Sequence, residues 1–233
     1  MKRFFGRKLG ENIVIENDEF FHLKKVLRMQ EGDKVIASVN DEYDYYCTIA
    51  TIGKNDCLLD VDKEELCPSL PQKNITLFQM MPKKDYFDNI LPKSIELGVS
   101  KIVPFSSQYT MVKTLKRERV LTQVMTACKQ CERSKLVEVE DVISFKEVLK
   151  QLESYDVVIF AYENETMPFD PSMLEGKQNI AVVVGNEAGF TDQEASEIKG
   201  LKNTSSISLG KRILRCDTAV VATLSLVSVL SGN

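Results

Sequence analysis

The chain has 233 residues, a formal net charge of −4 and a hydrophobic share of 43%. These values are near the averages for a soluble globular protein, and the length fits one large domain or two modest ones. No apolar run approaches the roughly 18–20 residues of a membrane-spanning helix. The start, Met1–Lys8, is basic, but no apolar run of signal-peptide length follows it. We therefore expect a cytoplasmic protein.

The six cysteines are scattered along the chain. Without a secretory signal they are best interpreted as reduced thiols. Cys128 and Cys131 form a single C-x-x-C motif with no second pair, and the only histidine, His22, lies far away in sequence. A zinc site needs four ligands. We therefore expect no metal and interpret the motif as two small residues one helical turn apart.

The charge is unevenly distributed. Residues 1–30 hold seven basic and four acidic residues, whereas residues 41–65 are strongly acidic. Residues 111–135 hold seven lysines and arginines and only two glutamates. Because phosphate binding needs a local basic surface rather than a basic protein, this stretch is a candidate RNA contact. An ordinary solvated helix face explains the charge equally well.

The N-terminal third is predicted to form a small β-barrel. Alternating and β-branched patterns predict strands over residues 12–16, 34–39, 43–52 and 57–61. A helix interrupts them, because Phe20, Leu23, Val26 and Leu27 share a face behind Asp18, a candidate N-cap. Residues 67–73 then place two prolines in five positions, which is typical of a linker.

After the linker, strand-like and helical runs alternate, which predicts an α/β domain with a largely parallel sheet. The predicted strands cover residues 75–80, 101–105, 157–161, 180–184 and 206–209. The predicted helices cover residues 86–97, 117–133, 145–152, 192–199 and 217–230. Pro92 lies inside the first of these helices, so that helix either starts late or kinks.

A glycine-bearing loop, Val184–Phe190, follows the most apolar predicted strand and precedes a helix that Thr191 or Asp192 could cap. Glycines allow positive φ angles and close approach of a ligand to the backbone. The G-x-x-x-G spacing is not the G-x-G-x-x-G dinucleotide fingerprint, and the Gly-Lys-Ser/Thr of a P-loop is missing. The loop by itself is either a ligand site or a structural connector.

A second loop, Ser208–Ala219, follows another predicted strand and opens the last helix. Asp217 and Thr218 could cap that helix through its free N–H groups. The exposed backbone could instead bind an adenine and a ribose, and Arg215 could face an anionic substrate. Both loops are predicted at the carboxyl ends of strands, where ligands bind in open α/β sheets.

Five segments in chain order resemble the small-subunit ribosomal RNA methyltransferase E family, a branch of the SPOUT class. The two loops are similar to the family motifs G-P-E-G-G and L-G-x-R-I-L-R-x-E-T-A. His22–Arg28 followed by Glu31–Asp33 resembles H-x-x-x-V-L-R…G-D. Lys93–Val99 followed by Pro104 resembles K-x-x-E-L-G-V…P, and Ala127–Arg133 resembles A-x-x-Q-x-x-R. The matches cover nearly the whole chain.

The resemblance implies a PUA-like, RNA-binding β-barrel over residues 1–70 and a trefoil-knotted SPOUT methyltransferase domain over residues 74–233. It also implies an obligate homodimer with the active site at the dimer interface. The methyl donor would be S-adenosyl-L-methionine, and the substrate a uridine of 16S rRNA, methylated at N3. The implied donor-binding residues are Val184, Gly185, Asn186, Glu187, Gly189, Leu209, Gly210, Ile213, Leu214, Thr218 and Ala219.

Methylation at uridine N3 needs help, because N3 carries a proton at neutral pH and is a poor nucleophile. A base must take the proton, or a cation must stabilise the anion as it forms. Arg133 and Arg215 are candidates for holding the uridine or a phosphate, and Glu187 and Glu96 for the base or an orienting group. Ion pairs or loop hydrogen bonds would explain each of them equally well. The candidate substrate contacts are His22, Arg28, Lys93 and Lys113.

Several positions depart from the family pattern. Asn186 and Ala188 stand where the family prefers proline and glycine, and Asp217 replaces the usual glutamate. The arginine that usually follows the Pro104 strand is absent, and Lys113 could take its place. These departures favour a second hypothesis, a non-catalytic RNA-binding protein with a degenerate donor pocket. A third, an unrelated nucleotide-dependent enzyme, is disfavoured by the missing fingerprints.

Overall fold

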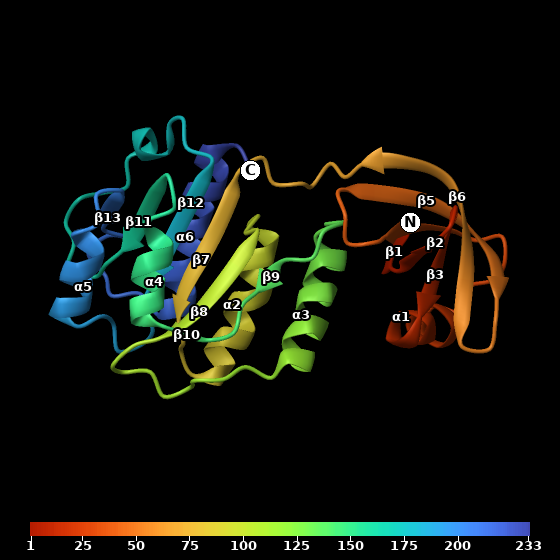
Figure 1. Cartoon of the computed structure of the whole chain (residues 1–233), viewed down its shortest axis with the longest axis horizontal. Coiled ribbons are helices and arrows are strands. Elements are labelled where there is room, and N and C mark those ends of the chain that lie inside the picture. The colour runs from red at the N-terminus through yellow and green to blue at the C-terminus, as the bar shows by residue number, and fades with distance from the viewer. The chain divides into compact units, whose positions relative to one another are not determined.

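The computed structural model describes residues 1–233, apart from the side chain of Lys84. The chain divides into two compact units, whose elements are labelled in Figure 1. Unit 1 comprises residues 1–70 together with 125–136, and unit 2 comprises residues 71–124 together with 137–233. In the described part of the chain, no helix is both long enough and apolar enough to span a membrane.

Unit 1 is built on a curled six-stranded sheet with the order β1-β4-β5-β6-β3-β2, in which only β1 and β4 are parallel. Its strands are β1 Lys2–Phe5, β2 Arg7–Leu9, β3 Asn12–Glu16, β4 Lys34–Ser38, β5 Tyr43–Ile52 and β6 Asp56–Leu66. The four predicted strands are confirmed. The sequence patterns missed β1 and β2, which are short and mostly basic.

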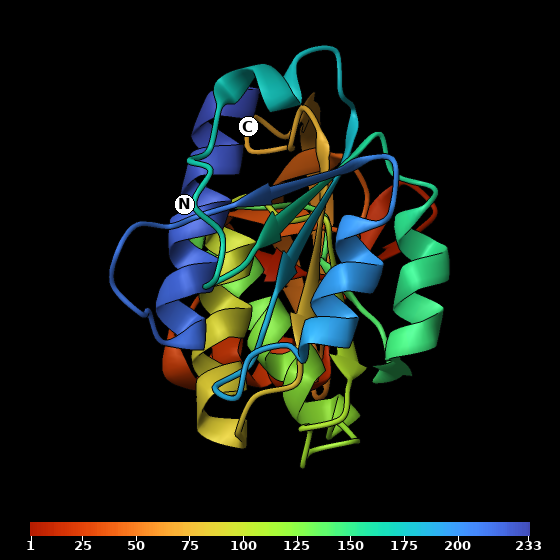
Figure 2. The ribbon, with the colours of Figure 1, turned by 90° about the vertical axis from the view of Figure 1, so that its left-hand side faces the viewer.

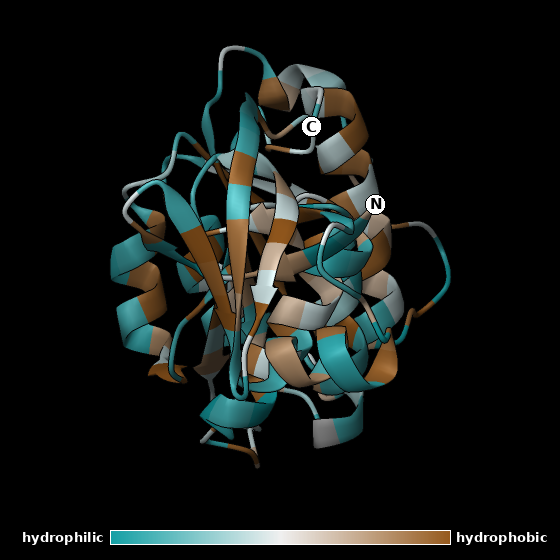
Figure 3. Cartoon of the chain, turned by 90° about the vertical axis from the view of Figure 1, so that its right-hand side faces the viewer, coloured by the Kyte–Doolittle hydropathy of each residue, from teal (hydrophilic) through white to brown (hydrophobic). Residues whose placement is uncertain are grey.

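The two edges of this sheet meet at Gly6, where β1 ends and β2 begins. β1 pairs with β4 and β2 pairs with β3, so one bent segment closes the barrel. A Cβ atom on Gly6 would lie 2.7 Å from Ile13 Cγ2 and 2.8 Å from the Val14 carbonyl oxygen, so only glycine fits. Inward side chains such as Phe4 and Ile13 fill the interior, and Figure 3 shows hydrophobic and hydrophilic residues alternating along the strands.

Helix α1, Asn17–Phe21, runs directly into a π-helical turn, η1, His22–Val26. The Leu27 N–H donates to the His22 carbonyl oxygen at 3.0 Å, and Arg28 then ends the turn with φ +55°. The predicted Asp18 cap is wrong. The N-cap residue is Glu16, which makes no side-chain capping hydrogen bond, and Asp18 lies in the first turn of the helix.

Residues 125–136 belong to unit 1 although they follow part of unit 2 in sequence. They include the second half of helix α3, Arg117–Gln130. The Lys129 ammonium forms an ion pair with Glu19, whose other carboxylate oxygen accepts from the Phe5 N–H at 2.9 Å. The Leu136 N–H donates to Asn40 Oδ1 at 2.9 Å. These polar contacts hold the segment against the barrel.

Unit 2 is a parallel sheet with the order β10-β8-β7-β12-β11-β13, with β9 beside β8. Its strands are β7 Asn74–Met80, β8 Lys101–Ser106, β9 Glu138–Val139, β10 Ile143–Ser144, β11 Val157–Ala161, β12 Asn179–Val184 and β13 Thr204–Ile207. Its helices are α2 Lys84–Glu96, the first half of α3, α4 Phe145–Leu152, the short 3-10 helix η2 Pro171–Leu174, α5 Asp192–Lys199 and α6 Cys216–Ser231.

Helices cover both faces of the unit 2 sheet. In Figure 2, α4 and α5 lie on one side of the strands, and α2 and α6 lie on the other. Strand β12 is buried along nearly its whole length, as expected for a central parallel strand. One core cluster joins Val148 of α4 and Ile198 of α5 to the sheet residues Phe78, Phe105 and Phe160.

The predicted elements of unit 2 are confirmed, with three corrections, and β9, β10 and η2 were not predicted. Helix α3 ends at Gln130, three residues before the predicted end. The last strand, Thr204–Ile207, starts and ends two residues earlier than the predicted strand 206–209. Helix α2 begins at Lys84 and continues through Pro92 to Glu96, so a late start is wrong. In the turn that contains Pro92, Ser94 Oγ donates to the Ile90 carbonyl oxygen at 2.8 Å.

Candidate functional site

A cavity of about 540 Å³ lies at the carboxyl ends of three neighbouring strands of unit 2. Its walls are the loops that follow β11, β12 and β13. Tyr86 from the first turn of α2 and Ala219 from α6 complete them. The two glycine-bearing loops, far apart in sequence, therefore meet at one edge of the sheet, as predicted from the order of the strands.

All but one of the predicted donor-binding residues line this cavity. They are Val184, Gly185, Asn186, Glu187, Gly189, Leu209, Gly210, Ile213, Leu214 and Ala219. Thr218 does not line it, because this residue lies on the exposed side of the first turn of α6. The geometry brings the predicted residues together, and their individual roles stay predictions.

Asn186 fixes the conformation of the first loop at a position where the family prefers proline. Its Nδ2 donates to the Met81 carbonyl oxygen at 3.2 Å, and its Oδ1 accepts from the Ala188 N–H at 2.9 Å. The Gly189 N–H donates to the Asn186 carbonyl oxygen at 3.1 Å and closes the turn. Asparagine thus supplies by hydrogen bonds the rigidity that proline would supply by its ring.

Two glycines keep the first loop open to the cavity. Gly189 has φ +68°, and a Cβ atom there would lie 2.3 Å from Glu163 Oε1. A Cβ atom on Gly185 would lie 3.1 Å from the Phe190 ring. The Gly185 carbonyl oxygen accepts from Gln79 Nε2 at 3.2 Å. Side chains at these glycines would fill the space where a ligand approaches the backbone.

Glu187 lies in the cavity wall but is tethered. Its Oε1 accepts from the Lys83 N–H at 3.2 Å, which joins the first loop to the start of α2. Because one oxygen is engaged by the backbone, the carboxylate is better placed to orient a bound group than to act as a free base. Its negative charge also reaches Cys216. Burial, and then Glu187, raise the pKa of that thiol to about 11, so it stays protonated at neutral pH.

The loop that follows β11 forms the third wall of the cavity. It contains two residues that were not predicted from the sequence, Tyr162 and Glu163. They directly follow the predicted strand 157–161, so the rule that located the other two loops also identifies this one. Lys199 holds the loop in place: its Nζ lies 2.9 Å from Glu165 Oε2 and 4.7 Å from the centroid of the Tyr162 ring. This ion pair, more than any other contact, lowers the pKa of Glu165 to about 2.

The second loop carries the positive charge of the site. Lys211, Arg212 and Arg215 line the cavity, are exposed, and form no ion pair with any residue that the structure describes. Between them, the Ile213 side chain is 93% exposed. Three unneutralised cations and an exposed apolar side chain at the rim of a cavity are suited to an anionic ligand with flat apolar faces.

The predicted capping of α6 is wrong. The N-cap residue is Arg215, without a side-chain capping hydrogen bond, and Asp217 lies in the first turn. Asp217 Oδ1 is buried and has no hydrogen-bond partner among the described residues. By contrast, Thr191 caps α5 as predicted and forms a reciprocal capping box with Glu194.

Four other predicted site residues do not line the cavity. Lys93 and Glu96 lie in the last turns of α2, roughly 10–15 Å along the helix axis from Tyr86, since each residue of an α-helix rises about 1.5 Å. His22 and Arg28 belong to unit 1. The predicted roles of these four residues, as substrate contacts or as base or orienting group, stay predictions.

Arg133 belongs to unit 1. Its side chain is 6% exposed, and burial lowers the pKa of its guanidinium. Its predicted role, like that of Arg215, stays a prediction. Lys113 lies exposed in the segment between β8 and α3, outside the cavity.

The basic stretch 111–135 is divided between the two units, and much of its charge is neutralised. Arg117 pairs with Asp141 at 2.9 Å, Lys129 with Glu19, and Lys135 with Glu42 at 3.8 Å. Arg119 pairs with Asp88. The stretch is thus not one continuous cationic surface. Lys113 and Lys116 are the exposed cations of its first half that form no ion pair in the described part of the chain.

The cysteines form no site. All six are free thiols, and Cys128 is fully buried. Among the residues that the structure describes, no group of three or more histidine, cysteine, aspartate or glutamate side chains could hold a metal ion. Cys128 lies in the last turn of α3 and Cys131 directly follows the helix, where its N–H donates to the Ala127 carbonyl oxygen at 3.0 Å. The two residues are thus one helical turn apart.

Comparison with known proteins defines the class to which this fold and cavity belong. A family model described as RNA methyltransferase domain matches residues 68–228, and one described as RNA methyltransferase PUA domain matches residues 15–62. The predicted fold class, a SPOUT methyltransferase domain preceded by a PUA-like barrel, is confirmed.

Individual relatives narrow this class. The ribosomal RNA small subunit methyltransferase E of Bacillus subtilis is 30% identical over 98% of this chain and 96% of its own length. The protein of the same name from Rickettsia conorii is 29% identical over 99% of this chain and 96% of its own length. The chain belongs to the ribosomal RNA small subunit methyltransferase E family.

A solved structure agrees along the whole chain. It is the ribosomal RNA small subunit methyltransferase E of Neisseria gonorrhoeae bound to S-adenosyl methionine, with a TM-score of 0.90 and 26% identity. The alignment covers 99% of this chain and 98% of that one. The departures at Asn186, Ala188 and Asp217 therefore occur within the family's fold and do not disrupt it.

Proposed function

We propose that this protein is a cytoplasmic enzyme that transfers a methyl group from S-adenosyl-L-methionine to N3 of a uridine in small-subunit rRNA. The observation that carries the proposal is the cavity itself. Two loops separated in sequence converge at the carboxyl edge of the sheet, in a member of a family of RNA methyltransferases. A relative of this chain was solved with S-adenosyl methionine bound.

The cavity suits the methyl donor chemically. Gly185, Gly189 and Gly210 leave the backbone accessible to the polar groups of an adenosine, because side chains would obstruct two of these positions and Gly210 is open with φ +103°. Apolar side chains such as Leu209 and Leu214 can cover the faces of the adenine. The bound donor supplies an electrophilic methyl group carried on a positively charged sulfur.

Two carboxylates in the walls fit that positive charge. Glu163 and Glu187 stand on neighbouring loops of the cavity. Opposite charge close to a sulfonium stabilises its binding without taking part in the transfer. We assign Glu187 an orienting role, because the Lys83 N–H holds its Oε1 at 3.2 Å.

Arg215 is the group that we assign to the uridine. Methylation at N3 passes through a ring that has lost its N3 proton and carries negative charge on its carbonyl oxygens. A guanidinium donates hydrogen bonds to such oxygens and stays charged at any physiological pH. Arg215 lies at the cavity and forms no ion pair within the described part of the chain. Stabilising the anion in this way would lower the barrier to loss of the proton.

The substrate must present an unpaired uridine, because N3 lies on the Watson–Crick edge of the base. The uridine therefore needs a single-stranded or flipped conformation, and the protein needs further contacts that hold the RNA around it. We assign these contacts to the PUA unit, residues 1–70, with His22 and Arg28 as candidates, and to Lys113 of unit 2.

We further propose that the enzyme works as a homodimer. A second cavity of about 720 Å³ lies along one face of α6, lined by Phe169, Pro171, Ser208, Leu209, Ala222, Ser225, Leu226, Val229 and Leu230. Val229 is 73% exposed and Leu230 46% exposed. Because Ser208 and Leu209 line both cavities, a second copy packed on α6 would also rigidify the donor site.

Calorimetric titration with S-adenosyl-L-methionine, followed by a transfer assay, tests the proposal. Wild type is expected to bind the donor and to form N3-methyluridine in 16S rRNA, which mass spectrometry detects. The Arg215→Ala variant is expected to keep the heat of donor binding and to lose the transfer. Donor binding without transfer by wild type would favour the non-catalytic alternative, and no heat at high donor concentration would contradict the proposal.

A further inference from the structure

A separate cavity of about 490 Å³ lies in unit 1, between the α1–η1 corner and the hairpin that joins β5 to β6. It is lined by Asn17, Phe20, Phe21, Lys24, Lys25, Lys54 and Asn55. The lining combines three cations, two amides and two aromatic rings, and none of these residues is acidic. No function assigned above uses this cavity.

The two phenylalanines of the cavity have different roles. Phe20 is 8% exposed and belongs to the core of the barrel, whereas Phe21 is 60% exposed. The exposed part of the Phe21 side chain does not stabilise the barrel, because this apolar surface stays in water. Beside cations, such a ring is the platform on which an unpaired nucleic-acid base stacks.

The cations of the cavity are available to a ligand. Lys24 Nζ donates to the Gly53 carbonyl oxygen at 2.7 Å and lies 5.1 Å from the centroid of the Phe20 ring. These contacts hold the ammonium at the wall of the cavity, and its other N–H groups can donate to a ligand. Lys25 and Lys54 are exposed and form no ion pair with the residues that the structure describes.

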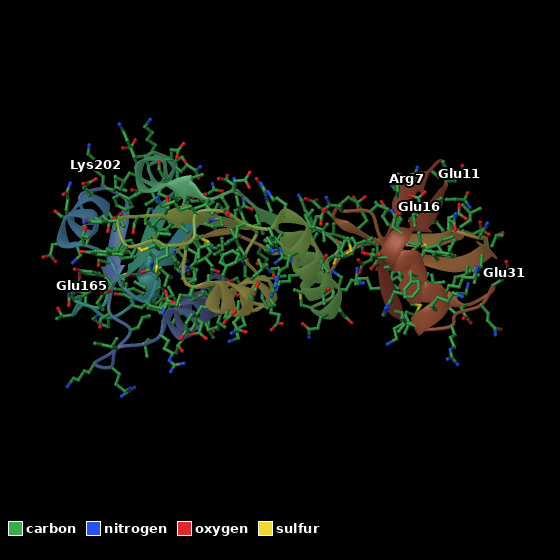
Figure 4. The ribbon with its side chains drawn as sticks, turned by 90° about the horizontal axis from the view of Figure 1, so that it is seen from below. Arg7, Glu11, Glu16, Glu31, Glu165 and Lys202 are labelled. Atoms are coloured by element: carbon green, nitrogen blue, oxygen red, sulfur yellow. The ribbon has the colours of Figure 1, made fainter. Side chains whose placement is uncertain are left out.

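Nearby carboxylates are engaged elsewhere. Glu31 accepts from the Ile52 N–H at 2.9 Å, below the hairpin, and Glu16 pairs with Arg7 at 3.3 Å. Figure 4 shows Arg7 and Glu16 next to each other, with Glu31 at the end of the unit. Neither of these two carboxylates therefore forms an ion pair with Lys24, Lys25 or Lys54.

The backbone of this corner is unusual in two places. Asn17 has φ +55°, and the chain continues through the π-helical turn η1. A π-helical turn contains one extra residue and often marks a functional position. Lys24 and Lys25 both lie in this turn, and both line the cavity.

We infer that this cavity binds one unpaired nucleotide of an RNA, with the base stacked on Phe21 and the adjacent phosphate between Lys25 and Lys54. The amides of Asn17 and Asn55 can each donate to and accept from the edge of a base. The inference rests on the proposed function, because it takes RNA as the ligand. It adds a recognition site in the barrel, outside the donor cavity.

An acidic peptide is the main alternative occupant. It would use the lysines but would have no flat group to place against Phe21. Nucleotides carry both a phosphate and a π-face, so they satisfy the cations and the ring together. The experiment must therefore detect the ring–base contact and not only the charge.

The absence of tryptophan from the chain makes a direct test possible. A Phe21→Trp variant of the full chain carries a single tryptophan in the cavity. A single-stranded RNA of about ten nucleotides is expected to quench its fluorescence, because a stacked base quenches indole emission. The matched control is Tyr43→Trp, on the same barrel but outside the cavity at a residue 41% exposed, where no quenching is expected.

Affinity measurements by fluorescence anisotropy of labelled RNA complete the test. Phe21→Tyr keeps a ring and should bind like wild type, whereas Phe21→Leu should bind about tenfold more weakly. Lys25→Ala combined with Lys54→Ala should flatten the salt dependence by about one to two charges. A poly-glutamate peptide should compete only weakly.

Three results would overturn the inference: RNA binding by Phe21→Trp without quenching, wild-type affinity of Phe21→Leu, or poly-glutamate binding as tightly as RNA. Calorimetry with S-adenosyl-L-methionine on the same variants separates this inference from the proposed function. Donor binding does not depend on Phe21. Failure of donor binding in wild type would contradict the proposed function, whereas loss of the quenching alone would contradict only the RNA subsite.

Discussion

Individual residues decide whether the donor cavity is open, and Gly189 is the clearest case. Its φ of +68° is unfavourable for other residues, and a Cβ atom there would point at Glu163. We expect Gly189→Ala to weaken the binding of S-adenosyl-L-methionine by about tenfold or more, because strain and obstruction act together. Titration calorimetry measures the change.

The matched control for this variant is Gly176→Ala. Gly176 has nearly the same φ, +69°, but nothing lies within 4 Å of its added Cβ atom, and it does not line the donor cavity. Both variants should lose similar stability from backbone strain, roughly 1 kcal/mol. Equal donor affinities of the two variants would show that Gly189 has no special place in the site.

Buried thiols make the stability of the fold sensitive to alkali. Burial, above other causes, raises the pKa of Cys216 to about 11 from the ordinary 9.0. The unfolded chain loses this proton first, so the stabilisation is complete below pH 9 and is lost as the pH rises towards 11. Raising the pH from about 8 to about 10 should therefore lower the free energy of unfolding by roughly 1 kcal/mol through this group.

Urea unfolding at the two pH values, compared with the Cys216→Ala variant, measures this contribution. The variant lacks the titrating thiol and should lose less stability between the two conditions. Cys47 and Cys57 have raised pKa values too, about 12 and about 11, so a common alkaline loss remains in both proteins. The same loss in wild type and variant would contradict the role of Cys216.

At the scale of single elements, the barrel depends on the bend between β1 and β2. A Cβ atom on Gly6 would lie within 2.8 Å of three atoms of β3, two of them in the buried side chains of Ile13 and Ile15. We expect Gly6→Ala to destabilise unit 1 by about 1–3 kcal/mol through overpacking. Hydrogen exchange of the β5 amides reports on the stability of this unit.

Gly10→Ala is the comparison for this variant, because it lies in the β2–β3 turn with open space around it and φ +64°. The added methyl group causes backbone strain without a clash, and we expect it to lower the free energy of unfolding by about 1 kcal/mol. A larger loss for Gly6→Ala than for Gly10→Ala is predicted. The reverse order would mean that the bend at Gly6 tolerates a side chain.

Local sequence patterns predicted the central elements well and the edges poorly. β12 gives a strong signal because both of its faces are buried, so nearly all of its residues are apolar. α4 gives a strong signal because one stripe of the helix is buried, so its apolar residues recur with the helical period. β1 and β2 gave no such signal, since Lys2–Phe5 and Arg7–Leu9 are short and mostly basic. The partner of β1, strand β4, is also distant in sequence.

The donor cavity was predictable because strand order determines which loops meet. The distance of Glu96 and Lys93 from the cavity has a geometric cause. α2 starts at the carboxyl edge of the sheet and runs away from it, so only its first turn, with Tyr86, reaches the cavity. The burial of Arg133 could not be predicted, because charge patterns do not reveal burial.

At the scale of the whole molecule, the proposed homodimer explains the exposed apolar face of α6. We expect Val229→Glu to prevent association, because a carboxylate buried at the interface has no partner. Sedimentation velocity distinguishes dimer from monomer. The variant should also bind S-adenosyl-L-methionine more weakly, since Ser208 and Leu209 line both the α6 cavity and the donor cavity.

Leu121→Glu is the control for this prediction. Leu121 is an apolar residue of α3 that is 58% exposed and lies outside both cavities. It should leave the oligomeric state and the donor affinity unchanged. A monomeric wild type at micromolar concentration, or a dimeric Val229→Glu variant, would contradict the homodimer.

The activity that we propose for this chain is methylation of uridine N3 in small-subunit rRNA. The most direct measurement is mass spectrometric mapping of modified nucleosides in 16S rRNA from a strain that lacks the gene. The account predicts that one N3-methyluridine disappears and returns when the gene is restored. N3-methyluridine retained in full in the deletion strain would contradict it.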